Sequence, residues 1–239
     1  MPQVAGSPLD PALVAYHDKA SPITEQYRSV RTRLLSQNPA NQRRTLAITS
    51  SGIGEGKTVT TVNLAFVMAE LRHLNVLVLD GDFRRHSLAT MFNISPAPGL
   101  AEMIQGQAEL QDVLKPTCLP NLHVIPGGST GQSNAAELLS SERAAELFKQ
   151  FRQQYHYVLV DTPPTNTFTD AGIIGQLCDA VLMVVRMNRT PEPFAKRAVR
   201  ILQANNIDIA GCILTGHVEQ TSRYPYYRYG YGYRYYENY

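Results

Sequence analysis

The sequence predicts an α/β protein in which a mainly parallel sheet lies between two layers of helices. Short runs that are apolar on both faces alternate with amphipathic stretches along most of the 239 residues. Strands of that kind are typical of parallel sheets covered by helices on both sides. A glycine-rich turn also follows the first of these strands and precedes a helix, as in phosphate-binding α/β proteins.

Six apolar runs are predicted to be strands, at 45–50, 75–80, 122–128, 157–161, 180–185 and 209–216. Five stretches have helical patterns, at 21–37, 59–71, 135–154, 170–178 and 193–206. Ser21 can cap the first helix, and Pro22 suits its first turn. The chain therefore divides into a loose N-terminal arm (1–20), one α/β domain (21–217) and a flexible tail (218–239).

Composition excludes several classes of function. The hydrophobic content of 44 % is enough for a sizeable core, and the net charge of +2 is too small to indicate nucleic acid as a partner. The three cysteines are far apart, which fits ordinary thiols in a reducing compartment. Because the sequence has neither a signal-peptide pattern nor an apolar run of about 18 residues, we expect a cytoplasmic protein.

The segment SSGIGEGKT has the pattern of a phosphate-binding loop. Small residues let backbone N–H groups turn toward phosphate oxygens, and the helix that begins here adds its dipole. Lys57 would reach the β- and γ-phosphates, and the Thr58 hydroxyl would bind Mg²⁺. The strict pattern has glycine at position 51, where this chain has Ser51. A glycine-rich turn without a ligand is the alternative.

Carboxylates lie at the ends of two predicted strands. Asp80 ends VLVLD, Asp82 follows two residues later, and Asp161 closes YVLVD. Because the carboxyl ends of parallel strands meet at one edge, all three should face the phosphates. A strand-end turn would explain each carboxylate alone. Together with the loop they indicate Mg²⁺-dependent chemistry on a nucleoside triphosphate, in which water, a protein hydroxyl or a small molecule could accept the phosphoryl group.

Three segments together resemble a known family. SSGIGEGKT, LVLDGDFRR and YVLVDTPP are similar to the Walker A, Walker A′ and Walker B motifs of the bacterial tyrosine kinases, the autokinases of capsule and exopolysaccharide export. PGLAEMIQG, NAAELLSS, EQYRSVR and the tyrosine-rich end extend the resemblance from about residue 20 to the end of the chain. The resemblance implies a three-layer sandwich like that of P-loop NTPases, so that 21–217 would be a P-loop kinase domain.

The resemblance also implies roles for residues. ATP and Mg²⁺ would be the cofactors, and Lys57, Asp80 and Asp82 would be catalytic, although which aspartate is the base stays open. The metal ligands would be Thr58, Asp80, Asp82 and Asp161. The nucleotide-binding residues would be Gly52, Ile53, Gly54, Glu55, Gly56, Lys57, Thr58 and Val59.

The partners implied by the resemblance are other copies of the chain in a ring-like homo-oligomer, a membrane-embedded activator of the chain-length-determinant type, and a tyrosine phosphatase, with no nucleic acid. The activator would recruit the protein to the inner face of the membrane. Glu25, Arg28 and Arg31 would build subunit contacts, since their spacing places them on one side of a helix. A solvated charged face is the alternative.

Two differences from other P-loop families bear on the function. Chromosome-partitioning and septum-site ATPases have a lysine at the position of Gly52, and septum-site ATPases end in a membrane helix rather than in tyrosines. Relatives of the kinase type often have an asparagine after the last core strand, where this chain has Thr215 or Gly216. The differences from the partitioning and septum-site ATPases favour the kinase type. The alternative function is a non-kinase ATPase switch, like those ATPases, that controls assembly of a complex.

The tail contains nine of the thirteen tyrosines, and the resemblance implies that they accept phosphate. An extended chain over 218–239 could span roughly 70 Å, so it could reach its own site or that of a neighbour. Each phosphate would add about −1.5 to −2 charges to the tail, in which segment 223–239 has three arginines and one glutamate. An aromatic tail that binds partners or single-stranded nucleic acid is the alternative. The nine are Tyr224, Tyr226, Tyr227, Tyr229, Tyr231, Tyr233, Tyr235, Tyr236 and Tyr239.

Overall fold

The computed structural model describes residues 9–216, which form a seven-stranded sheet in the order β3-β4-β2-β5-β1-β6-β7. The six neighbouring pairs are parallel except β3 and β4, so the prediction of a mainly parallel sheet is confirmed. The strands are β1 (Arg44–Ser50), β2 (Val76–Asp80), β3 (Lys115–Pro116), β4 (Leu122–Ile125), β5 (Tyr157–Asp161), β6 (Ala180–Arg186) and β7 (Ile209–Thr215).

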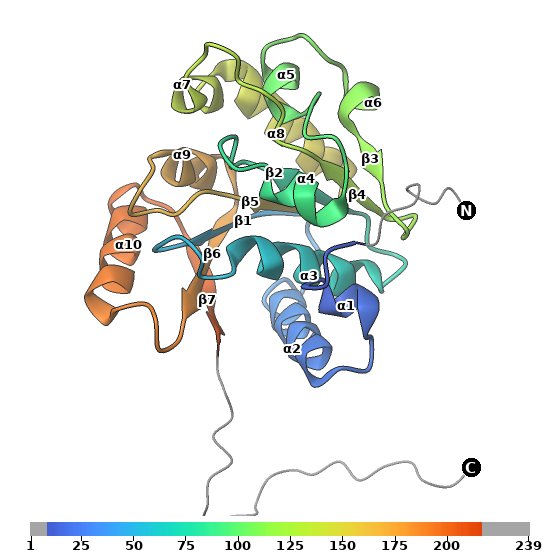
Figure 1. Ribbon diagram of the computed structural model, residues 1–239, viewed down its shortest axis with the longest axis vertical. Coiled ribbons are helices and arrows are strands. Elements are labelled where there is room, and N and C mark those ends of the chain that lie inside the picture. The colour runs from blue at the N-terminus through green and yellow to red at the C-terminus, as the bar shows by residue number, and fades with distance from the viewer. Residues whose placement is uncertain (1–8, 217–239) are drawn as a thin grey trace, which may run out of the picture.

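Helices cover both faces of the sheet, which confirms the predicted three layers. Figure 1 shows α2 and α3 on one side of the sheet and α5 to α8 on the other. One apolar core joins the sheet to α1–α4, and a second joins it to α5–α10. The helices are α1 (Val14–His17), α2 (Pro22–Ser36), α3 (Lys57–Ala69), α4 (Ser87–Phe92), α5 (Leu100–Ile104), α6 (Leu110–Val113), α7 (Ala135–Leu139), α8 (Glu142–Gln154), α9 (Asp170–Leu177) and α10 (Glu192–Ala204).

The register of the central strands positions the site. Every residue of β2 and β5 is buried, as the continuous apolar runs predict. Asp80 lies beside Asp161 across the β2–β5 pair, and Asp161 lies beside Ile48 of β1 on its other side. The two strands that end in aspartate are therefore neighbours, and one of them adjoins the strand that leads into the phosphate loop.

Two predicted elements differ from the structure. The helical pattern over 135–154 is two helices, because the Ser141 hydroxyl accepts a hydrogen bond from the Ala144 N–H (3.2 Å) and starts α8 anew. The strand predicted over 122–128 ends at Ile125, since Pro126 has no N–H with which to continue the ladder. Strand β3 and the short helices α4, α5 and α6 were not predicted, because so few residues give no clear periodicity.

The N-terminal segment 9–20, predicted as part of a loose arm, is packed against α3. Leu13 is completely buried and Ala15 nearly so. Asn63 of α3 accepts a hydrogen bond from the Ala15 N–H (2.8 Å) and donates one to the Ala12 carbonyl (2.9 Å). The prediction is wrong for this segment because four of its apolar residues pack on the core, a pattern too short to recognise in sequence; they are Leu9, Ala12, Leu13 and Ala15.

Within residues 9–216, no helix combines the length and the apolar character that a membrane span requires.

We expect Leu13→Ala to lower the free energy of unfolding by about 2–5 kcal/mol, because the side chain is fully buried between the segment and α3. Urea unfolding followed by circular dichroism measures this change. Ile23→Ala is the matched control, since half of the Ile23 side chain is exposed and its loss should change stability little. Equal effects of the two substitutions would show that the segment does not contribute to the core.

Candidate active site

The predicted phosphate loop connects β1 to α3 at the carboxyl edge of the sheet. Gly54 and Gly56 have positive φ angles of 78° and 94°, a conformation that side chains disfavour, and α3 begins directly after Gly56. Lys57 and Thr58 form its first turn. The structure thus brings all the predicted nucleotide-binding residues, from Gly52 to Val59, to one helix N-terminus, where backbone N–H groups and the helix dipole favour an anion.

Ser51 and Thr215, the two positions at which this chain differs from the family's motifs, both contact Glu55. The buried Glu55 carboxylate accepts hydrogen bonds from the Ser51 hydroxyl (2.7 Å) and the Ser51 N–H (3.2 Å). The Thr215 hydroxyl donates to the Glu55 carbonyl oxygen (2.8 Å). Ser51 and Thr215 therefore hold the loop in shape from two sides, which the sequence pattern alone did not indicate.

The three predicted carboxylates lie next to the loop. The Thr58 hydroxyl donates to Asp161 Oδ2 (2.7 Å), and Lys57 Nζ lies 3.5 Å from Asp82 Oδ2. The Asp82 N–H donates to Asp80 Oδ1 (3.0 Å). All three aspartates are buried, with Asp82 the most exposed at 2 %. Side chains from β1–α3, β2 and β5 thus converge as the sequence predicted.

Burial favours the protonated forms of Asp80 and Asp161. It raises the pKa of Asp80 to about 8, and the neighbouring Asp161 charge adds to the increase. Burial also raises the pKa of Asp161, while Lys57 and the Thr58 hydrogen bond oppose that shift. A nearby divalent cation would favour the ionised forms, because it supplies the positive charge that the buried site lacks.

The donor set fits Mg²⁺ when phosphate oxygens complete it. Asp80 Oδ2 and Asp82 Oδ1 are buried and have no hydrogen-bond partner among the described residues. Over residues 9–216, no three His, Cys, Asp or Glu side chains form a group that could hold a metal ion by themselves. Mg²⁺ commonly takes only one or two carboxylates, with waters and substrate phosphates as its remaining ligands. Thr58, Asp80, Asp82 and Asp161 are the residues that would contribute.

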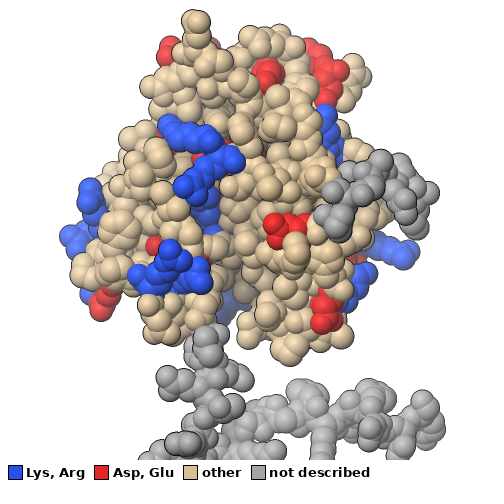
Figure 2. Space-filling model, in the orientation of Figure 1, with Lys and Arg blue, Asp and Glu red and all other residues tan. Residues whose placement is uncertain are grey.

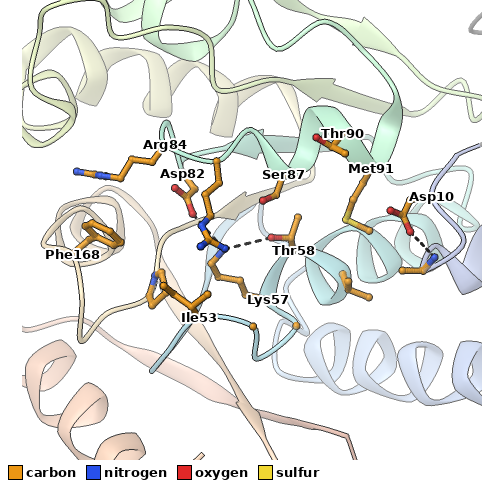
Figure 3. A pocket seen from close by; sticks show the side chains of 16 residues that line it. Asp10, Ile53, Lys57, Thr58, Asp82, Arg84, Ser87, Thr90, Met91 and Phe168 are labelled. Carbon is orange, nitrogen blue, oxygen red and sulfur yellow. Dashed lines mark hydrogen bonds and ion pairs between the residues drawn. The ribbon is translucent and has the colours of Figure 1, made fainter.

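A pocket of about 440 Å³ opens beside the loop, within the usual range of ligand sites of about 300–1,000 Å³. Lys57, Thr58 and Asp82 line its middle. Figure 3 shows Arg84 and Phe168 on one side of Lys57 and Thr58, and Met91 and Asp10 on the other. The pocket therefore extends beyond the phosphate loop in two directions.

Several pocket residues were not predicted. Arg84 forms an ion pair with the buried Asp170, and its guanidinium lies 4.4 Å from the centre of the Phe168 ring. Arg84 stands in LVLDGDFRR, so its position could have signalled a role. Asp10 and Met91 come from segments with no recognisable motif, and only the folded chain brings them to the loop.

Basic side chains surround the loop on more than one side. Arg186 Nη1 donates to the Gly54 carbonyl (3.1 Å), and Arg84 and Arg85 line the pocket. Figure 2 shows most of the Lys and Arg side chains of this face on its left half, whereas acidic side chains are scattered over both halves. This distribution favours a polyanionic ligand such as a nucleoside triphosphate at the loop.

The residues predicted at a subunit interface also make contacts inside the chain. Arg28 Nε donates to Glu70 Oε2 (2.8 Å), and Arg31 Nη1 donates to the same oxygen (3.0 Å). Glu25 pairs with Arg28 and is more exposed. The interface role of the three stays a prediction. The predicted phosphoacceptor tyrosines, 224–239, lie outside the described residues.

The chain is similar to known proteins over most of its length. Residues 43–205 match the family model described as an AAA domain. A putative tyrosine-protein kinase, CapB of Staphylococcus aureus, is 30% identical over 88% of this chain and 92% of its own length. The kinase domain of the Escherichia coli tyrosine kinase ETK superimposes with a TM-score of 0.82 at 30% identity, covering 92% of this chain and 84% of that one.

Some relatives are much longer. The putative tyrosine-protein kinase EpsB of Ralstonia nicotianae is 33% identical over 93% of this chain, but the matched part is 29% of EpsB.

Asp80 should make stability depend on pH. Its pKa is about 8 in the folded chain against an ordinary 3.8, so the folded state keeps a proton that the unfolded state releases between these values. Without Mg²⁺, the contribution of this proton to the free energy of unfolding is complete below about pH 4. It is lost as the pH rises to about 8, by up to about 1.4 kcal/mol per pH unit. Asp80→Asn, which cannot ionise, should therefore gain stability relative to the wild type from pH 5 to pH 8.

Urea unfolding at several pH values measures this difference, with Asp208→Asn as the control because Asp208 is exposed. A constant difference between wild type and Asp80→Asn would contradict the prediction.

Proposed function

The chain belongs to the bacterial tyrosine-protein kinase family, and from this premise we propose that it transfers the γ-phosphoryl group of ATP to tyrosines of its own C-terminal cluster. The observation that carries the proposal is the convergence of Lys57, Thr58 and Asp161 with the partly unpaired carboxylates of Asp80 and Asp82. Phosphoryl transfer needs phosphate-binding groups, Mg²⁺ ligands and a proton acceptor in one place.

In the proposed reaction, the loop N–H groups and Lys57 bind the phosphates of ATP. Mg²⁺, when bound, neutralises charge on the β- and γ-phosphate oxygens. Lys57 is 3.5 Å from Asp82, so its movement to the phosphates would free that carboxylate. The phenol oxygen then forms a bond to the γ-phosphorus while the bond to the β–γ bridging oxygen breaks and ADP leaves.

The phenol proton passes to a carboxylate, for which Asp82 is the better placed. Asp82 lines the pocket, whereas Asp80 is completely buried behind it and accepts the Asp82 N–H. Asp80 and Asp161, together with Thr58, would then be the main metal contacts. In this division Asp82 accepts the proton and the neighbouring Asp80 holds the metal.

The acceptors in this proposal are the nine tyrosines between 224 and 239, presented to a neighbouring subunit of a ring-like oligomer in which Glu25, Arg28 and Arg31 form contacts. Segment 223–239 has three arginines and one glutamate before modification, so the tail would bind a neighbour when unmodified and leave it as phosphates accumulate. The family resemblance supports a role in capsule or exopolysaccharide synthesis and export. It also supports a cytoplasmic location, a membrane-embedded activator and a reversing tyrosine phosphatase.

We expect the purified chain to gain mass in steps of about 80 Da with Mg-ATP, and Lys57→Met to gain none, because the mutant lacks the amine that binds the phosphates. Intact-mass spectrometry with peptide mapping measures the additions and assigns them to 224–239. Lys196→Met is the matched control, since Lys196 pairs with Glu192 on the exposed surface of α10. Additions that persist in Lys57→Met, or ATP turnover with no additions in the wild type, would contradict the kinase proposal.

The tail hypothesis predicts that phosphorylation reduces oligomer size. Two phosphates reverse the charge of the tail and should weaken its contact with a neighbour. Light scattering coupled to size-exclusion chromatography, before and after incubation with Mg-ATP, measures the mass of the assembly. An unchanged mass after extensive phosphorylation would exclude charge-driven release.

A further inference from the structure

The phosphate loop has two sides with different chemistry. On one side β2 and β5 bring Asp80, Asp82 and Asp161, and on the other β6 and β7 bring Arg186 and Thr215. An acceptor hydroxyl must meet the γ-phosphorus opposite the leaving oxygen and within reach of a proton acceptor. It therefore has to approach from the side of the carboxylates.

A distinct part of the pocket lies on that approach. Beyond Thr58 and Asp82 it is lined by Ala12 of the N-terminal segment, Val59 of α3, and Thr90 and Met91 of α4. Figure 3 shows Met91, Thr90 and Asp10 together on the side of Thr58 that faces away from Arg84 and Phe168. Apart from the hydroxyls of Ser87 and Thr90 its walls are apolar, whereas the part beside the loop is lined by charged groups.

We propose that this part of the pocket is the binding subsite for the acceptor tyrosine, with Ala12 and Met91 as the walls for its ring and Asp10 and Thr90 at the rim. The inference rests on the proposed function and adds to it the residues that recognise the acceptor. A phenol ring needs apolar contacts along its length and a polar group at its hydroxyl. Ala12, Val59 and Met91 provide the first, and Asp82 provides the second.

The walls are fixed before any acceptor binds. The Asp10 N–H donates to the Met91 carbonyl (3.1 Å), which joins the N-terminal segment to α4. Asn63 holds Ala12 and Ala15 against α3, and Leu13 anchors the segment in the core. Because these residues are already ordered, the site itself loses little conformational entropy when a peptide binds.

The charge at the rim matches the sequence of the tail. Asp10 forms no ion pair with any residue between 9 and 216, and its Oδ1 accepts only the Ala12 N–H (2.8 Å). Each of the three arginines in the tail is next to a tyrosine, in RY at 223–224 and in YRY at 227–229 and 233–235. An acceptor in the subsite would therefore bring a cation close to Asp10, which favours this tail over acidic peptides.

The test uses the full chain and a synthetic peptide of residues 226–236, with initial rates measured over a range of peptide and of ATP concentrations. Ala12→Phe fills the subsite, and Thr90→Phe narrows it from a position that is exposed, where a larger side chain does not have to enter the core. Each should raise KM for the peptide by about tenfold or more while KM for ATP changes less than about twofold. Ala20→Phe is the matched control, because Ala20 is exposed on the same segment away from the pocket.

Asp10→Asn tests whether the negative charge of Asp10 contributes to peptide binding. It should raise KM for this peptide by about threefold to tenfold, but not for a peptide in which both arginines are replaced by glutamine.

The possible results distinguish a failure of the subsite proposal from a failure of the proposed function. If the wild type phosphorylates the peptide and both phenylalanine variants keep its KM, or lose ATP binding equally, the subsite is wrong and the kinase proposal stands. If the wild type phosphorylates neither itself nor the peptide, the proposed function fails and the subsite fails with it.

Discussion

The hydrogen bond from the Thr58 hydroxyl to Asp161 connects the two parts on which the site depends. Asp161 is fully buried at the end of β5, and Thr58 is in the first turn of α3. A carboxylate that far from water needs a partner, and the helix N-terminus provides one. The bond therefore fixes α3, and with it the phosphate loop, at a set distance from the carboxyl edge of the sheet. The register of β2 beside β5 then places Asp80 and Asp82 on the same edge.

Helix α3 serves three purposes along its length. Its first turn presents Lys57 and Thr58, its middle packs on the sheet, and Asn63 on its surface holds the N-terminal segment that reaches α4. The same packing that buries the helix thus shapes the wall of the pocket. Residues at the start of the chain contribute to the site for this reason, although they are far from the motifs in sequence.

Much of the fold could be predicted because its central strands are apolar on both faces, a pattern that few other structures require. The loop and the three aspartates could be predicted because each follows a strand and has a motif of its own. Asp10, Met91 and Phe168 could not, since their place depends on how the N-terminal segment, α4 and the β5–α9 connection pack. Leu13 shows the same limit in the core, because a few buried residues in so short a segment give no periodicity to recognise.

Arg28 and Arg31, the two arginines of the family's motif, also act inside the chain through their contact with Glu70. Glu70 follows the last residue of α3, so the two arginines of α2 neutralise an acidic group at the far end of the helix that presents the phosphate loop. The hydrogen bond from Arg28 is the chief cause of the lowered pKa of the Glu70 carboxyl, and Arg31 adds to it, so the two arginines keep this group ionised to a lower pH. Replacing either arginine removes a positive charge from α2 and at the same time takes from Glu70 one of its two cationic partners. An assembly defect from such a variant would therefore combine a lost neighbour contact with a loosened helix, and only a companion change at Glu70 separates the two.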